Sequence, residues 1–258
     1  VLKKVKELAP GAKLFGKNGS ERTASEELNY IKAIPAREER ARLRKDRDSA
    51  TSAENQKRLR EYDAIATEVF IAEDQWRSKG GFKADLNVAT EEGARMAAGY
   101  LVFLRNRTAV LMTDVQKRMQ VGERREDIER DILPLALALI NESLAVGIKE
   151  RPTPEQTVGA IALLKGKIAE QFTGEGKGHE VAMAAFVKAL FGEGCHVATA
   201  TEPLAEAALN QFLPAFEALG LTAGVVTDKQ TPDEKRTNYR KSITYGTMSR
   251  FGFDYLLD

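Results

Sequence analysis

Apolar residues recur at helical spacing through the first half of the chain. Between about residues 26 and 72 they lie three or four positions apart, as in amphipathic helices (Leu28, Ile31, Ile34, Leu59, Tyr62, Ile65 and Val69). Further helices are expected from residue 90 to about 104, from 108 to 120 and across 127–146, where Pro134 could start or kink the helix. Residues 20–150 are therefore predicted to be almost wholly helical.

The pattern changes in the second half. Short apolar runs at 194–200, 223–227 and 242–247 predict three buried strands, and the stretch from Glu202 to Leu219, which ends at Gly220, predicts a helix. Strands that alternate with helices are typical of a parallel α/β sheet.

A glycine-rich segment lies between a possible strand at 167–171 and a helical run at 181–191. It reads Thr173-Gly174-Glu175-Gly176-Lys177-Gly178. In a phosphate-binding loop, glycines let backbone N–H groups approach the phosphates, the next helix adds a partial positive charge, and a lysine reaches the terminal phosphates. The alternative is a plain glycine-rich turn. Gly178 stands where a Ser or Thr normally binds Mg²⁺.

The composition of the chain mainly excludes certain classes of partner and of protein. The 258 residues hold 39 Lys+Arg and 38 Asp+Glu, a balance that gives no electrostatic footprint for nucleic acid. No run of about 18 apolar residues predicts a transmembrane segment. The charged stretch from Arg37 to Arg60 is interpreted as a solvated helix face, with a basic docking surface as the alternative. The first residue, Val1, and the apolar run before Asp258 indicate a piece of a longer protein.

The single cysteine and the two histidines are interpreted as structural. Cys195 permits no intrachain disulfide, indicates a reducing compartment and is expected to be a small core residue. His179 is expected on the surface of the helix after the loop, with a contact to a phosphate as the alternative. His196 lies beside Cys195, but a four-ligand zinc site would need several carboxylates as well.

From about Asp114 onward the sequence resembles the SecA preprotein translocase family. The matching blocks fall in family order, and they are Arg151-Pro152 with Gln156, Gly166 to Glu170, Thr173 to Lys177, Gly220 to Thr222, Gly224 to Thr227, Glu234 to Arg236, Ile243 to Thr247 and Phe251 to Leu256. The resemblance implies that ATP or ADP can bind.

The same resemblance implies the site residues. Gln156 stands where the family's glutamine reads adenine, Arg151 stands beside it, and Lys177 is the phosphate lysine. Thr173, Gly174, Glu175 and Gly176 complete the loop. For Arg151 and Gln156 the alternative is a polar pair in a loop without a ligand.

The departures from the family are also informative. Gly178 removes the hydroxyl ligand, so magnesium binding is expected to be weak or absent. Residues 201–208 lack the family's arginines, and Met248, Ser249 and Leu257 replace other polar positions. The acidic pair that would polarise the attacking water is expected beyond Asp258, and Asp233-Glu234 sits at a helix start instead. No residue is therefore assigned a catalytic role.

The predicted fold class is α/β with a large all-α N-terminal region, followed by an incomplete RecA-like P-loop subdomain with parallel strands. Residues 1–113 would form a helical region, 114–150 a helical lead-in, and 151–258 the truncated SecA-like subdomain. The preferred function is a SecA-like nucleotide-binding module of a larger protein with weak or absent ATPase activity. The alternatives are a fragment of a working translocase motor and an interaction or effector protein without nucleotide chemistry.

The expected partners are other parts of a longer chain or a protein partner, without nucleic acid and without a transmembrane segment. The expected location is the cytoplasm, or a target cell reached from a bacterial cytoplasm if the protein is an effector.

Overall fold

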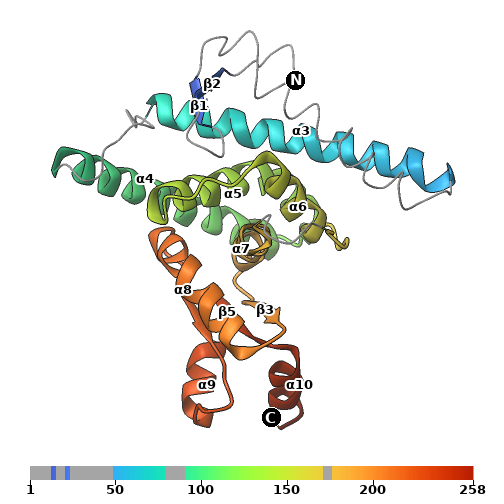
Figure 1. Ribbon diagram of the computed structural model, residues 1–258, viewed down its shortest axis with the longest axis vertical. Coiled ribbons are helices and arrows are strands. Elements are labelled where there is room, and N and C mark those ends of the chain that lie inside the picture. The colour runs from blue at the N-terminus through green and yellow to red at the C-terminus, as the bar shows by residue number, and fades with distance from the viewer. Residues whose placement is uncertain (1–12, 16–20, 24–48, 80–90, 171–175, 258) are drawn as a thin grey trace.

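The computed structural model describes residues 13–15, 21–23, 49–79, 91–170 and 176–257. Long helices occupy one end of the molecule and a small sheet with shorter helices occupies the other (Figure 1). No helix in these described ranges is long and apolar enough to cross a lipid bilayer.

Helices α3 (Ser49–Lys79), α4 (Glu91–Gln120), α5 (Arg125–Gly147) and α6 (Pro154–Leu164) build the helical end. The centre of this end is α5, which packs against α3, α4, α7 (Lys177–Ala189) and α8 (Glu202–Ala218). Its apolar side chains Leu133, Leu137, Leu139 and Ile140 have no exposed surface. The burial of this helix on several sides explains why its sequence is apolar nearly all round.

Three parallel strands form the sheet at the other end. They are β3 (Cys195–Thr199), β4 (Ala223–Val225) and β5 (Ile243–Thr247), in the order β3-β5-β4. Both outer strands pair with the start of β5, because Cys195 and Ala223 are each opposite Ile243. The three strands predicted from the sequence and their parallel arrangement are confirmed.

Helices cover the two faces of this sheet. Val197 and Tyr245, which are paired across β3 and β5, are buried in the main core with α7 and α8 (Glu202–Ala218). Successive side chains of a strand alternate between faces, so His196 lies on the other face. There it stacks on Phe251 of α10 (Met248–Leu257) and meets Tyr239 of α9 (Pro232–Tyr239) edge-on.

Local capping chemistry explains where two of the helices begin. Thr153 caps α6 and Thr231 caps α9, and in each case the hydroxyl accepts the backbone N–H of the residue three positions on. In the reciprocal hydrogen bond, the Gln156 and Glu234 side chains accept the backbone N–H of the capping threonine. A proline occupies the first helical position in both, where its missing N–H is not needed.

Three details of the sequence reading need correction. The N-terminal region is not all helical, because β1 (Lys13–Phe15) and β2 (Glu21–Thr23) pair antiparallel. The Asn18-Gly19 step between them is a hairpin signal that the helical pattern obscured. The two helices predicted at 90–104 and 108–120 are one continuous α4, since no breaker separates them. Residues 167–170 form no strand. The helix predicted between residues 26 and 48 lies outside the described residues.

Candidate functional site

The start of α7 carries the described end of the glycine-rich segment. Gly176 is the N-cap residue, with φ 77° and ψ 39°, and Lys177 is the first residue of the helix. The φ value is in the left-handed region that glycine adopts without a steric penalty. The Lys177 side chain is exposed at a helix N-terminus, which favours negative charge. Thr173, Gly174 and Glu175 lie outside the described residues.

Gln156 joins α6 to this position. Its Nε2 donates to the Gly176 carbonyl oxygen at 3.4 Å, while its Oε1 accepts the Thr153 N–H at 2.9 Å. A Cβ on Gly176 would lie 2.3 Å from Gln156 Nε2, so any other residue here would have to displace the Gln156 amide. The structure therefore brings together three of the predicted site residues, Gln156, Gly176 and Lys177.

Arg151 is directed into the helical end of the molecule. Its Nη1 lies 2.7 Å from Glu142 Oε1 and 3.2 Å from Glu73 Oε2. Burial disfavours the charged guanidinium, but the Glu142 and Glu73 carboxylates outweigh it and raise the pKa of Arg151 above its ordinary value. Tyr100 donates its hydroxyl to the second Glu142 oxygen at 2.9 Å. This cluster ties the loop after α5 to α3, α4 and α5.

The cluster extends to the first turn of α6. Asn141 Nδ2 donates to Glu73 Oε1 at 2.9 Å and lies 3.4 Å from Thr157 Oγ1. The Thr157 hydroxyl also reaches back to the carbonyl of the capping residue Thr153 at 3.3 Å. The Arg151 cluster and the Gln156 contacts therefore support the same helix start.

His179 is not on the surface, which corrects the expectation drawn from the sequence. Only 8% of it is exposed, and its Nε2 lies 2.9 Å from Glu150 Oε2. Phe212 of α8 meets its ring edge-on, with the centroids 5.2 Å apart. The burial follows from helical geometry, because His179 faces α8 and the loop after α5 rather than the solvent side of α7.

Gly178 is exposed, but the direction a side chain would take is filled. A Cβ built there would lie 3.0 Å from Phe212 Cε2 and 3.1 Å from Cζ, closer than ordinary van der Waals contact. Within the part of the chain that the structure describes, no group of three or more His, Cys, Asp or Glu side chains could hold a metal ion.

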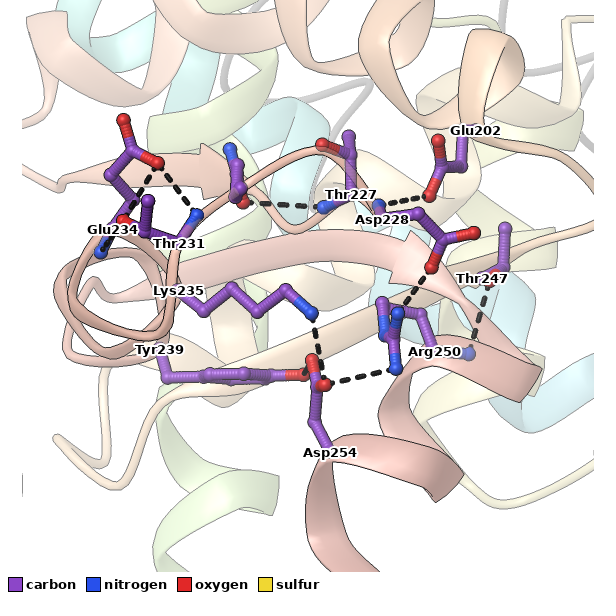
Figure 2. Close-up of polar contacts among 11 residues, drawn as sticks. Glu202, Thr227, Asp228, Thr231, Glu234, Lys235, Tyr239, Thr247, Arg250 and Asp254 are labelled. Atoms are coloured by element: carbon purple, nitrogen blue, oxygen red, sulfur yellow. Dashed lines mark hydrogen bonds and ion pairs between the residues drawn. The ribbon is translucent and has the colours of Figure 1, made fainter. Parts of the chain in front are cut away.

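A second polar cluster connects α9 and α10 and reaches the turn after β4 (Figure 2). Its centre is Asp254 of α10, whose carboxylate accepts from Lys235 Nζ at 3.2 Å, Tyr239 Oη at 2.8 Å and Arg250 Nη2 at 3.1 Å. The other guanidinium nitrogen of Arg250 pairs with Asp228, after β4. The cluster attaches α9 and α10 to the end of the sheet.

The acidic pair Asp233-Glu234 lies at the start of α9, as the sequence predicted. Thr231 donates both its backbone N–H and its hydroxyl to Glu234, at 2.8 and 2.9 Å, and these bonds lower the pKa of the carboxyl. Asp233 is 91% exposed and pairs with Arg236 on its own helix. Both carboxylates therefore make local contacts at the start of α9.

The pKa values of both Cys195 and His196 are shifted because neighbouring groups keep water away from them. Cys195 is half-buried against the core rather than fully inside it, and burial raises the pKa of its thiol. His196 is exposed overall, but the Phe251 and Tyr239 rings shield one side of its imidazole from water, and this desolvation lowers its pKa.

Several residues of these clusters were missed by sequence reasoning. A signal was present for Glu142, since an acidic residue within the apolar run from Leu133 to Leu144 predicts a buried and paired charge. No local signal pointed to Phe212, which reaches Gly178 from a helix about 30 residues further along the chain.

Comparison with known proteins adds the family. A match to the SecA DEAD-like domain family covers residues 47–258. The chain belongs to this family. The matched region starts well before Asp114, so it includes α3 and α4, for which the motifs gave no resemblance.

Individual relatives match shorter stretches. A protein translocase subunit SecA from Stutzerimonas stutzeri is 40% identical over 152 residues, which is 57% of this chain and 17% of the relative. One from Clostridium botulinum is 40% identical over 141 residues, 55% of this chain and 16% of the relative. A protein translocase subunit SecA 2 from Clostridioides difficile is 39% identical over 155 residues, which is 60% of this chain and 19% of the relative. The chain thus spans less than a fifth of these SecA proteins.

Proposed function

We propose that this chain is a SecA-like nucleotide-binding module of a larger protein, which holds ADP or ATP at the start of α7 and has weak or absent ATPase activity. The observation that carries the proposal is the exposed Lys177 at the helix N-terminus, directly after a left-handed Gly176 in a phosphate-loop sequence. Backbone N–H groups, the helix N-terminus and one ammonium group together suit a diphosphate.

The finer description of the fold is part of this proposal. Residues 151–258 would be a truncated RecA-like P-loop subdomain, residues 114–150 its helical lead-in, and residues 1–113 a mainly helical region that also holds β1 and β2. The parallel order β3-β5-β4, with helices on both faces, supports the RecA-like assignment. The adenine role of Gln156 and a nucleotide role for Arg151 also stay predictions, since both side chains make protein contacts in this structure.

The low activity rests on two residues. Gly178 offers no hydroxyl to a magnesium ion that would bridge the phosphates. Glu234 is bound by both donors of Thr231, so it caps α9 rather than acting as a general base. The second candidate function is a piece of a translocase motor that works only with the rest of its chain. This candidate is favoured by the names of the matching relatives, which are translocase subunits.

Calorimetric titration with ADP tests the binding site. We expect Lys177→Ala to weaken binding by about tenfold or more, because an ammonium-to-phosphate contact is lost. Lys229→Ala is the matched control, since Lys229 is also exposed but lies after β4. Equal affinities of the parent and Lys177→Ala would place the site elsewhere. If neither ADP nor ATP binds at millimolar concentration, the chain is an interaction protein that reuses the fold.

Steady-state phosphate release tests the activity. We expect turnover no higher than the background of the buffer. Turnover at the level of typical ATPases that disappears in Lys177→Ala would contradict the low activity and favour the motor.

A further inference from the structure

We propose that Phe212 closes off the position from which the residue after the phosphate lysine binds magnesium, so that the site takes a nucleoside diphosphate free of metal. This inference rests on the nucleotide-binding function proposed above and goes beyond it. There, only the missing hydroxyl was considered. Here the Cβ that would carry that hydroxyl is also crowded by the Phe212 ring.

The first step is the contact at position 178. Any residue other than glycine would place its Cβ 3.0 Å from Cε2 and 3.1 Å from Cζ of Phe212. A threonine would add two more heavy atoms on that Cβ. The backbone angle at Gly178 is not in the left-handed region, so sterics and not φ restrict this position.

The second step is that the Phe212 ring is held in place. Only 1% of the residue is exposed, and its ring lies in the main core. His179 contacts it edge-on, and its imidazole Nε2 lies 2.9 Å from Glu150 Oε2. Interiors are close-packed, so a displaced ring would have to disturb these neighbours.

The third step is the consequence for the ligand. With no side chain at 178, the first turn of α7 presents the Lys177 and Gly178 backbone N–H groups and the Lys177 ammonium, while the His179 N–H already bonds to the Gly176 carbonyl at 3.0 Å. These donors bind an anion directly and need no bridging cation. The residues present therefore do not fit the usual magnesium arrangement.

A stability measurement on the 258-residue chain without nucleotide tests the steric claim. We expect Gly178→Ala to lower the melting temperature. Gly99→Ala is the control, because Gly99 is exposed within α4 and a Cβ there meets nothing within 4 Å. Alanine's better helix propensity should raise its melting temperature by about 2–4 °C. Equal rises for both variants would overturn the inference.

A double variant, Gly178→Ala/Phe212→Leu, tests whether Phe212 is the side chain that crowds position 178. Phe212→Leu removes the Cε2 and Cζ atoms that crowd position 178 and keeps the site apolar. In this background Gly178→Ala should no longer lower the melting temperature, which a double-mutant cycle measures. An unchanged penalty would mean that Phe212 is not the obstacle.

The metal claim is tested by titrating ADP with magnesium and with EDTA. We expect the parent and Gly178→Thr to show no gain from magnesium, and Gly178→Thr/Phe212→Leu to gain about tenfold in affinity. A gain in Gly178→Thr alone, or no gain in the double variant, would overturn the inference. If the parent binds no ADP at all, the nucleotide proposal fails, and the steric claim is still decided by the melting temperatures.

Discussion

The guanidinium of Arg151 lies 2.7 Å from the carboxylate of Glu142, a side chain with no exposed surface. The family resemblance assigned Arg151 to the nucleotide, whereas its contacts in the structure are with α3 and α5. Arg151 supplies a positive charge to the two buried acidic residues Glu142 and Glu73, and such a charge is costly to lose because a buried carboxylate needs compensating partners.

We therefore expect Arg151→Met to lower the free energy of unfolding by about 3–5 kcal/mol, since it removes a cation that contacts two buried carboxylates. Urea denaturation monitored by circular dichroism measures this. Arg124→Met is the control, because Arg124 is 77% exposed in its pair with Asp127 and should cost no more than about 1 kcal/mol. A stable Arg151→Met that binds ADP much more weakly would show that Arg151 serves the nucleotide instead.

Asp254→Asn should loosen the attachment of α9 and α10. The change removes the negative charge that faces Lys235 and Arg250, whose side chains are 16% and 13% exposed. We expect a loss of about 3 kcal/mol in unfolding free energy. Asp233→Asn changes a 91% exposed carboxylate and should cost no more than about 1 kcal/mol in the same urea experiment. Similar losses in both variants would contradict the importance of the Asp254 cluster.

His196 should make stability depend on pH. Its pKa in the folded chain is below the ordinary value of 6.5, because desolvation disfavours the charged ring. The unfolded chain then binds the proton more readily, so stability falls as the pH drops below 6.5 toward the folded pKa. In the His196→Phe variant, the loss of stability that comes from protonation of this histidine should disappear. Melting temperatures at pH 7.5 and 5.5 should therefore differ less in the variant, and an equal difference would argue against the shifted pKa.

Gly176→Ala should cost more than Gly122→Ala. Both glycines have left-handed backbones, with φ 77° and 81°, so both changes impose about 1–2 kcal/mol of backbone strain. A Cβ at Gly122 meets nothing within 4 Å, while one at Gly176 would clash with Gln156 Nε2. Unfolding in urea should show the additional loss only for Gly176→Ala. Equal losses would mean that Gln156 moves aside freely.

Much of the fold could be predicted from local patterns. The starts of α6 and α9 follow from capping residues and prolines, and the three strands follow from short apolar runs between glycines and polar residues. The strand expected at residues 167–171 is absent from its described part, although the composition suits one, because a strand also needs a neighbour to pair with.

The candidate site was predictable only in part. The position of Lys177 follows from the loop motif, since the motif itself places the lysine at a helix start. The burial of His179 and the contact of Phe212 with Gly178 depend on how α8 packs against α7, which no local pattern encodes. The same holds for Arg151, whose two acidic partners come from helices that are adjacent only in the folded chain.

The side-chain amide of Gln156 makes the two helix starts mechanically dependent on each other. One end of the amide completes the cap of α6 and the other holds the carbonyl of Gly176, so a shift of Gly176 strains the cap. From Thr153 the hydrogen bonds continue through Thr157 and Asn141 to Glu73 in α3. A displacement at Gly176 thus has a continuous path of polar contacts to α3, the longest of the described helices, and hydrogen exchange along α3 would register it.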